Sequence, residues 1–453
     1  MMLLFDFLLA GALFLSSATA LVAPSQDPFY TPPAGFASKA PGTVLRSRTV
    51  QTAFLGLVPN PVQGYQLLYR TTATNGSAIA TVTTVFKPFG AALDKFVSFQ
   101  TAYDSSDTVC DPSYNYQLGN NNTDLIVAFE SLILESYILE GYIVSAPDYE
   151  GPDAAFSPGH LSGMGVLDSI RAVSSFASLG FTTSKPAVVA VGYSGGAIAT
   201  GTASLQSTYA PELNIKGFAS GGTPANLTGT LVFLDGELFS GFLPAALAGQ
   251  LKPSAYQAEL EPLYNKIITP FGRSKVEYAD ENCAQNDIFN FAEQSILSTK
   301  FQTLGEGLLY DPTISGIFEQ NIMGIHTNQT PVAPVYLYHA RNDEIIPYLN
   351  ASTLYNNWCD QGATVHFTTF GNGGHLTTEL LGVPSTLQFV NAAFAGTVAK
   401  GCSQQTVLNS TLNPLALAAS LEPLAVSLIE GLNIAGLEDI NIKNDLNLLK
   451  SGL

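Results

Sequence analysis

Short apolar segments alternate with longer, helix-like segments from about residue 49 to residue 225. The short segments are rich in β-branched and aromatic residues, which is typical of buried strands, and they lie at residues 79–88, 95–103, 142–149, 186–193 and 215–222. The helix-like segments lie between them, at residues 124–141, 163–180 and 197–206. This alternation predicts an α/β fold with a mostly parallel central sheet and helices on both faces.

Residues 226–324 have a different pattern, because strand-like runs disappear and helix-like segments dense in Leu and aromatic residues follow one another. We expect a helical cap or lid inserted into the sheet domain; the alternative is an extra helical layer. Strand-like runs resume at residues 333–343 and 363–375. The predicted organisation is a signal peptide (residues 1–20), a first core part (21–225), the cap (226–324), a second core part (325–400) and a Leu- and Ala-rich extension (401–453). The first core part begins with a Pro- and Ser-rich arm to about residue 45.

The first twenty residues form an apolar run that ends in the small residues Ala18, Thr19 and Ala20. This pattern predicts a secretory signal peptide that is cleaved after Ala20, although the run has no basic residue and contains Asp6. The alternative, a membrane anchor, is disfavoured because the run is short and no basic segment follows it. No later stretch is long enough to cross a bilayer, so we expect a secreted protein without an integral membrane anchor.

The composition favours a folded, acidic and extracellular protein. Hydrophobic residues make up 46% of the 453 positions and charged residues 12%, which permits a large core and excludes a mostly disordered chain. The net charge is -18 and no Lys/Arg-rich run occurs, so nucleic acid is a poor partner. We expect the protein to be a monomer.

The cysteines and the glycosylation sequons agree with export. An even set of cysteines in an exported chain predicts two disulfides, formed among Cys110, Cys283, Cys359 and Cys402. Asn-x-Ser/Thr sequons are candidate glycosylation sites, and they occur at Asn75, Asn121, Asn226, Asn328, Asn350 and Asn409.

The segment Gly192-Tyr193-Ser194-Gly195-Gly196 matches the pattern G-x-S-x-G between a strand-like and a helix-like segment. The pattern alone is weak, because glycine occupies 40 of 453 positions. Its context makes it strong, because small residues on both sides let the strand and the helix approach closely around an exposed serine. We therefore expect Ser194 to be a nucleophile; the alternative is an ordinary strand–helix turn.

A nucleophilic serine needs a base, and the chain has five histidines. His339 and His366 lie within strand-like segments and are expected to be core or sheet-face residues. His326 adjoins a sequon, and His160 lies in a Pro/Gly loop before a helix. His375 ends the Gly-rich segment TFGNGGH directly after a strand, where an imidazole can reach the C-terminal edge of the sheet. We therefore expect His375 to be the base.

The base needs an orienting carboxylate, and Asp343 lies directly beyond a predicted strand. The order Ser, Asp, His along the chain is the one that hydrolase folds of this type use. Glu344 competes for the role, but adjacent side chains diverge and Asp343 is nearer the strand end. For the oxyanion hole, we expect one N–H donor from Gly195 and a second from Asp104 or a neighbour in the loop after the strand at residues 95–103.

The joint order of these motifs resembles the fungal secretory lipases, from roughly Asp27 to Ala399. The segments that carry the resemblance are QTAYDSS with CDPSY, SAPDYEGPDAAF, GVLDSIRA, GYSGGAIAT, YHARNDEIIP and FGNGGH. The resemblance implies an α/β-hydrolase fold in which a helical cap is inserted after the half that carries the nucleophile.

The resemblance also implies the site residues and the disulfides. It places the catalytic triad at Ser194, Asp343 and His375. It places the oxyanion hole at Asp104 and Gly195. It pairs the cysteines as Cys110–Cys283, which would tie the oxyanion loop to the cap, and Cys359–Cys402.

Together these features predict a secreted, serine-dependent carboxylic-ester hydrolase. We expect a triacylglycerol lipase that acts on lipid or ester substrates, including those at an oil–water interface, through an acyl-enzyme on Ser194. The alternatives are a short-chain esterase or peptidase on the same fold, and a non-catalytic lipid-binding module. We expect no cofactor and no metal, because the sequence has no HExxH-like or His-rich cluster and no P-loop or dinucleotide fingerprint.

Overall fold

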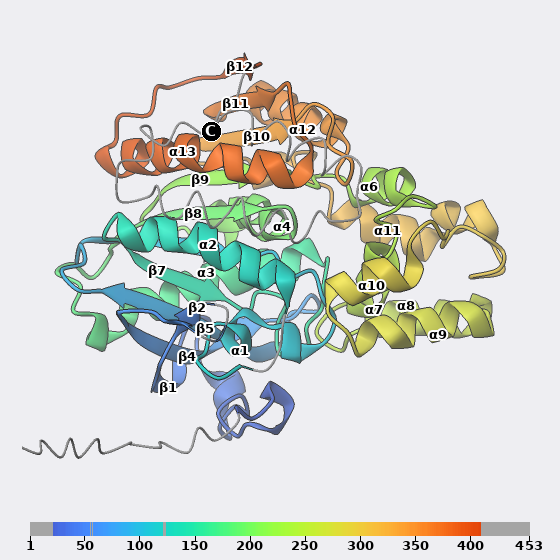
Figure 1. The fold of residues 1–453 in the computed structure, drawn as a ribbon, viewed down its shortest axis with the longest axis horizontal. Helices are drawn as coiled ribbons and strands as arrows, with labels where there is room; N and C mark the ends of the chain where they lie inside the picture. The colour runs from blue at the N-terminus through green and yellow to red at the C-terminus, as the bar shows by residue number, and fades with distance from the viewer. Residues whose placement is uncertain (1–20, 55, 57, 121–123, 409–453) are drawn as a thin grey trace, which may run out of the picture.

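The computed structural model describes residues 21–408, apart from residues 55, 57 and 121–123. Its centre is a ten-stranded sheet with the strand order β1-β4-β5-β7-β6-β8-β9-β10-β11-β12 (Figure 1). The strands of this sheet are β1 Val44–Val50, β4 Val62–Thr72, β5 Ala78–Pro88, β6 Lys95–Gln100, β7 Ile143–Pro147, β8 Ala187–Tyr193, β9 Ile215–Gly221, β10 Val335–Ala340, β11 Val365–Phe370 and β12 Ser403–Val407. A separate antiparallel pair joins β2 Ala53–Phe54 to β3 Val58–Pro59.

The sheet is antiparallel at one end and parallel over the rest. Strands β1, β4, β5 and β7 pair antiparallel, whereas every pair from β7 onward to β12 is parallel. The central strands β8 and β10 are buried along almost their whole length, which explains why their sequences are continuous apolar runs. The prediction of a mostly parallel sheet in an α/β fold is confirmed.

Helices cover both faces of the sheet, as predicted. Two helices, α2 Leu125–Leu139 and α13 His375–Ala395, pack on one face (Figure 1). The other face carries α3 Gly159–Ser175, α4 Gly195–Thr202 and α12 Tyr348–Asp360. The remaining short elements of this region are α1 Pro112–Asn115, α5 Gln206–Tyr209 and the 3-10 turns Pro24–Gln26, Phe36–Ser38, Thr108–Cys110, Ala177–Leu179, Ala203–Leu205 and Thr327–Gln329.

Between β9 and β10 the chain forms helices and no strand, in agreement with the sequence pattern. These helices are α6 Leu227–Leu234, α7 Phe242–Gln250, α8 Gln257–Ile267, α9 Pro270–Asp280, α10 Ala284–Phe291, the 3-10 helix Gly305–Tyr310 and α11 Pro312–Gln320. They lie together at one side of the sheet, on the right of Figure 1. We call residues 226–324 the helical block.

Both ends of the described chain contain elements that the hydrophobic pattern did not predict. The N-terminal arm makes 3-10 turns, and Phe29 packs on the sheet residues Leu68 and Val82. Strand β1 follows at once, and β4 is a long strand that the hydrophobic pattern had not indicated, because buried polar residues such as Gln66 interrupt it. The C-terminal extension begins with β12, whose side chains are mostly exposed.

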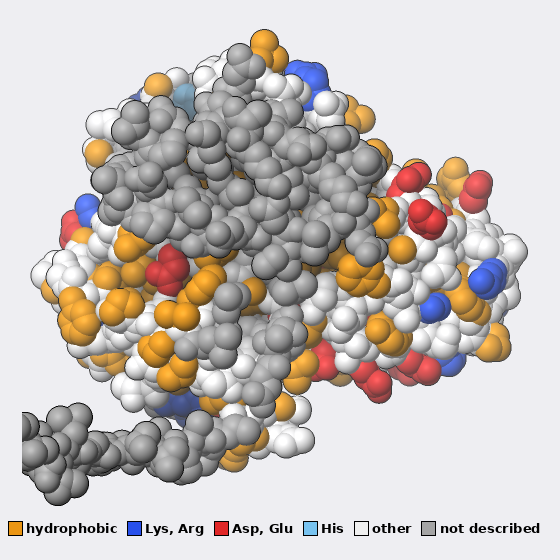
Figure 2. Space-filling view, in the orientation of Figure 1, with side chains coloured by type: hydrophobic (Ala, Val, Ile, Leu, Met, Phe, Trp, Pro, Cys, Tyr) orange, Lys and Arg blue, Asp and Glu red, His pale blue; other side chains and the backbone are white. Residues whose placement is uncertain are grey.

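The surface is weakly charged and acidic. On the face shown in Figure 2, the acidic side chains gather over the helical block, whereas Lys and Arg are scattered. Among the described residues, no helix has the length and apolar character that a membrane crossing requires. The predicted signal peptide, the extension beyond residue 408 and the sequons at Asn121 and Asn409 lie outside the described residues.

Candidate active site

Ser194 lies in the tight turn between β8 and α4. Its backbone is in the left-handed region, with φ at 51°, which is uncommon for a residue with a side chain. The turn depends on its glycines, because a Cβ atom on Gly192 would lie 2.3 Å from the carbonyl oxygen of Gly196. A Cβ on Gly196 would lie 2.0 Å from the carbonyl oxygen of Gln100 in the neighbouring strand β6. The close approach that the sequence predicted for these small residues is therefore present.

The structure brings Ser194, His375 and Asp343 into one hydrogen-bonded chain. His375 is the first residue of α13, and its Nε2 lies 2.8 Å from Ser194 Oγ. On the other side of the ring, Nδ1 lies 2.8 Å from Asp343 Oδ2 and 3.0 Å from Oδ1. A proton on Nδ1, facing the carboxylate, leaves Nε2 free to accept the serine proton. The three residues follow the ends of three different strands. Along the chain, Asp343 lies 149 positions after Ser194, and His375 lies 32 positions after Asp343.

Asp343 is held in place by groups that sequence reasoning did not connect with it. Its Oδ1 accepts the backbone N–H groups of Ile345 and Ile346, at 3.0 and 2.8 Å. His339, which we expected in the core, is fully buried in β10, and its Nε2 lies 3.3 Å from Asp343 Oδ2. Burial alone would raise the pKa of Asp343, but His375 and His339 hold that pKa below its usual value. Asp343 is therefore a carboxylate that stays charged.

Glu344 also contacts His375, but through a different atom. Its Oε2 accepts the backbone N–H of His375 at 2.9 Å, while Tyr193 Oη donates to the His375 carbonyl oxygen at 2.6 Å. Burial raises the pKa of Glu344 to about 7. Burial would lower the pKa of His375, but the Asp343 carboxylate raises it to about 9, and Glu344 adds to that effect. Both adjacent carboxyls thus act on one histidine, which the argument from diverging side chains had not foreseen.

Asp104 and Gly195 lie against each other beside Ser194. Asp104 follows β6 with φ at 46° and is almost fully buried. A Cβ atom on Gly195 would lie 1.5 Å from Asp104 Oδ1, so a side chain at position 195 is incompatible with this arrangement. Burial raises the pKa of Asp104 to about 7. Asp104, Ser194 and Gly195 line the same cavity.

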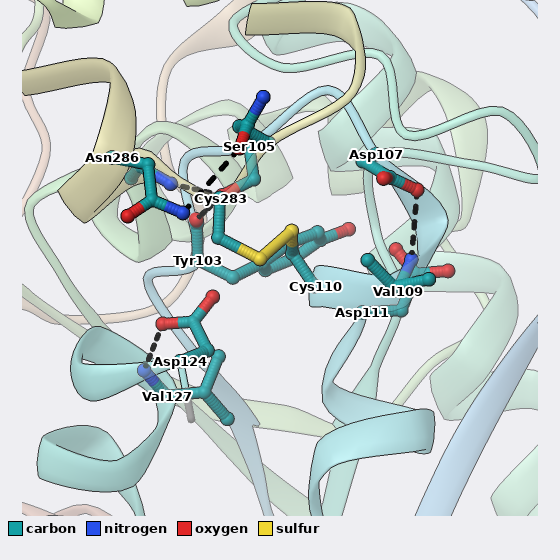
Figure 3. Close-up of a disulfide and its surroundings, with 12 residues drawn as sticks. Tyr103, Ser105, Asp107, Val109, Cys110, Asp111, Asp124, Val127, Cys283 and Asn286 are labelled. Carbon is teal, nitrogen blue, oxygen red and sulfur yellow. Dashed lines mark hydrogen bonds between the residues drawn. A yellow bond between two sulfur atoms is a disulfide. The ribbon is translucent and has the colours of Figure 1, made fainter. Parts of the chain in front are cut away.

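The loop that carries Asp104 is tied to the helical block at three points. Cys110 and Cys283 form a disulfide across 173 positions of sequence (Figure 3). Ser105 Oγ accepts the backbone N–H of Ala284 at 2.9 Å, and Ser106 Oγ donates to the carbonyl oxygen of Ala245 at 2.9 Å. The second disulfide, Cys359–Cys402, links α12 to the segment before β12. Both pairs are those that the resemblance implied.

The cavity above Ser194 is apolar and has a volume of about 150 Å³. It extends from the strand ends into the helical block, where its walls are mostly aliphatic and aromatic. Residues of four α-helices and of the segments between them line it, including Leu227, Leu231, Phe242, Leu243, Leu260, Leu263, Ile267, Ile296, Phe301, Ile314, Ile317 and Phe318. The polar residues that line it include Ser157 and Gln250, which sequence reasoning missed. No local motif marks them, because each becomes a wall residue only through tertiary packing.

His160, His326 and His366 do not line the cavity at Ser194. His160 is in the first turn of α3, 3.3 Å from Gln329, and His366 contacts Ser403 and Ala399 at the sheet end. Within the described residues, the one group with metal-ligand proximity contains Cys110, Cys283 and Asp124. Its two sulfur atoms are joined in the disulfide, so neither is available as a thiolate ligand.

The four described sequons are not equivalent. Asn75 and Asn328 are exposed. Asn226 is half-buried, and its Oδ1 accepts the Gly229 N–H at the start of α6. Asn350 is buried, and its Nδ2 donates to Thr230 Oγ1 at 2.8 Å. A glycan on Asn350 would have to replace this hydrogen bond, so Asn350 fits this structure least well among the described candidate sites.

A serine in a tight strand–helix turn, with a histidine and a carboxylate following in sequence at neighbouring strand ends, defines the α/β-hydrolase class. The family model described as "Secretory lipase" matches residues 116–401. The chain belongs to the secretory lipase family, as the resemblance indicated. A secreted triacylglycerol lipase of Malassezia furfur is 37% identical over 91% of this chain and 86% of its own length.

Solved structures and a second relative by sequence agree with this assignment. The closed state of Candida antarctica lipase A superposes with a TM-score of 0.81 and 31% identity, covering 91% of this chain and 96% of that chain. A lipase of Candida albicans is 36% identical over 88% of each chain. A cell-wall-degrading esterase of Xanthomonas oryzae, with a TM-score of 0.58 and 14% identity, shares the fold.

Proposed function

We propose that this protein is a secreted carboxylic-ester hydrolase that cleaves triacylglycerols, with Ser194 as the nucleophile, His375 as the base and Asp343 as its orienting carboxylate. The observation that carries the proposal is the single chain of contacts from Asp343 through both ring nitrogens of His375 to Ser194 Oγ. Family membership and the names of the relatives support the same reaction.

The reaction follows from this geometry. His375 Nε2 takes the proton of Ser194 as the hydroxyl oxygen attacks the ester carbonyl, and the resulting imidazolium is stabilised by Asp343. When the tetrahedral intermediate collapses, the proton on Nε2 passes to the leaving alcohol and an acyl-enzyme remains. A water molecule then gives a proton to His375 Nε2 and attacks the acyl carbon; as this second tetrahedral intermediate collapses, His375 returns the proton to Ser194 Oγ, and the carboxylic acid is released.

The negative charge that develops on the carbonyl oxygen needs donors. We assign this role to the backbone N–H of Gly195 and to Asp104, which lie together beside Ser194. Burial raises the pKa of Asp104 to about 7, so at a given pH its carboxyl carries no more negative charge beside the oxyanion than an exposed aspartate would.

The apolar cavity suits an acyl chain, because burial of methylene groups against aliphatic walls is favourable. We assign the helical block, residues 226–324, as the cap that builds this cavity over the sheet. The relatives are named secreted triacylglycerol lipases, and we extend that location and substrate class to this chain. We propose a monomer, with a signal peptide at residues 1–20.

The test uses the purified protein with emulsified triacylglycerols, with soluble p-nitrophenyl esters of increasing acyl length, and with a peptide anilide. We expect hydrolysis of both kinds of ester and none of the anilide. A fluorophosphonate probe should label the protein but not Ser194→Ala, with circular dichroism showing that the variant is folded. Activity on short soluble esters alone would identify a short-chain esterase instead, and an active Ser194→Ala variant would refute the site.

A further inference from the structure

The cavity beside Ser194 has a mostly apolar wall that includes one buried, hydrogen-bonded pair of polar side chains, Ser157 and Gln250. Ser157 lies in the loop between β7 and α3, and Gln250 is the last residue of α7 in the helical block. Gln250 Nε2 donates to Ser157 Oγ at 2.9 Å. The two residues are 5% and 6% exposed, so both polar side chains are removed from solvent.

The hydrogen bonding of this pair is incomplete. Gln250 Oε1 is buried and has no partner among the described residues. If the amide is turned over, Oε1 accepts from Ser157 and Nε2 loses its partner instead. In either orientation one polar atom of the amide is unpaired, which is unfavourable in a buried place.

The backbone around the pair does not require an amide here. Helix α7 is held against the loop by close backbone contact, since a Cβ on Gly249 would lie 2.3 Å from the Phe156 carbonyl oxygen. The Gln250 carbonyl oxygen accepts the backbone N–H of Tyr256 at 3.0 Å, a bond that any residue at this position can make. An unbranched apolar side chain such as Met would therefore fill the same space without an unpaired polar group.

We propose that Ser157 and Gln250 recognise a hydroxyl group carried on the otherwise apolar chain of the substrate, an inference that rests on the proposed ester hydrolysis. A hydroxyl group donates one hydrogen bond and accepts others, and the pair offers both a carbonyl acceptor and a hydroxyl donor. Ser157 and Gln250 both line the cavity, so a chain bound in it passes beside the pair. An unsubstituted chain leaves the amide unpaired.

The hydroxyl group can belong to the acyl part or to the alcohol part of the ester. Two series of esters separate these sources: saturated acyl chains with and without one hydroxyl group at successive positions, and one plain acyl chain esterified to alkanols or alkanediols. We expect wild-type kcat/KM to favour the hydroxylated member about tenfold in one series, near one position of the chain. Equal kcat/KM values in both series would overturn the inference.

Variants locate the recognition at the pair. Gln250→Met and Ser157→Ala should each bring the ratio of kcat/KM for hydroxylated and plain esters close to one. Gln206→Met is the matched control, because Gln206 is also a buried glutamine with an unpaired Oε1, but it lies outside this cavity. It should leave the ratio unchanged. A preference that survives in both pair variants would contradict the assignment.

A binding measurement separates this inference from the proposed function. Titration calorimetry on Ser194→Ala compares long-chain fatty acids and alkanols with their hydroxylated counterparts, without any turnover. If Ser194→Ala binds a hydroxylated ligand more tightly than the plain one, and the double variant Ser194→Ala/Gln250→Met does not, the recognition role of the pair is supported even if the wild-type protein hydrolyses no ester. Equal binding of all ligands, with ester hydrolysis intact, refutes the pair and leaves the proposed function standing.

Discussion

The strand ends that carry Ser194, His375 and Asp343 and the helical block that faces them are built in opposite ways. At the strand ends Asp343 and His375 are each fixed by several hydrogen bonds, many of them to the backbone. The helical block contributes mainly apolar packing: Leu231 of α6 lines the cavity, while its neighbours Val232 and Phe233 on the same helix are exposed.

This difference separates reaction chemistry from substrate choice. Hydrogen bonds are directional, so they hold the reacting atoms within the narrow limits that proton transfer requires. Apolar contacts are not directional, so a wall made of them tolerates changes of shape and can be retuned by substitution. Changes at the strand ends should therefore affect all esters alike, whereas changes in the helical block should affect esters according to their chains.

The largest effect is expected for Asp343→Asn. An amide at this position can hydrogen-bond His375 in the wrong tautomer, which leaves Nε2 unable to accept the serine proton. By analogy with other triads, kcat should fall about 10⁴-fold for short and long esters alike. Steady-state kinetics with both substrates checks this, and a loss confined to long chains would contradict the comparison.

A chain-dependent effect is expected for Leu231→Trp, which fills the cavity from the helical block. The kcat/KM for long acyl esters should fall about tenfold or more, while acetate and butyrate esters change little. Val232→Trp is the control, because Val232 is the next residue of α6 and is 53% exposed. If both variants lose activity on short esters to the same degree, α6 does not act on chain selection.

The link between the two regions can be cut at the Cys110–Cys283 disulfide. The double variant Cys110→Ala/Cys283→Ala should lose about 2–4 kcal/mol of unfolding free energy and several-fold in kcat, because the loop with Asp104 is released from the helical block. The control is the double variant Cys359→Ala/Cys402→Ala. The disulfide that it removes joins residues 43 rather than 173 positions apart, and neither cysteine lines the cavity. In the chain-entropy model, the control variant should lose about 1 kcal/mol less unfolding free energy than Cys110→Ala/Cys283→Ala, and its kcat should be unchanged.

The smallest effect is expected for Glu344→Gln, which keeps the acceptor for the His375 N–H but removes a charge. Glu344 helps to raise the pKa of His375 to about 9, so its loss lowers that pKa and frees the base at lower pH. The acid limb of kcat/KM should move down by about half a pH unit. Because burial raises the pKa of Glu344 to about 7, the two enzymes should converge below that pH. A shift toward higher pH would contradict this electrostatic role.

Local patterns in the sequence were sufficient for the α/β fold and the turn at Ser194. The turn depends on glycines next to the serine itself, so its requirements are visible within five consecutive positions. Asp343 and His375 could be chosen because strand ends of a parallel sheet meet at one edge, and few histidines competed. These are features that depend on residue type and on chain direction.

Only the tertiary structure decided which side chains outside those motifs meet. It turned Glu344 onto the backbone of His375, placed His339 beside Asp343 and buried the sequon residue Asn350 against α6. It also joined Ser157 to Gln250 across 93 positions. The reason is physical: a motif fixes the local backbone, but the contacts of one side chain with a distant segment depend on how whole helices and strands pack together.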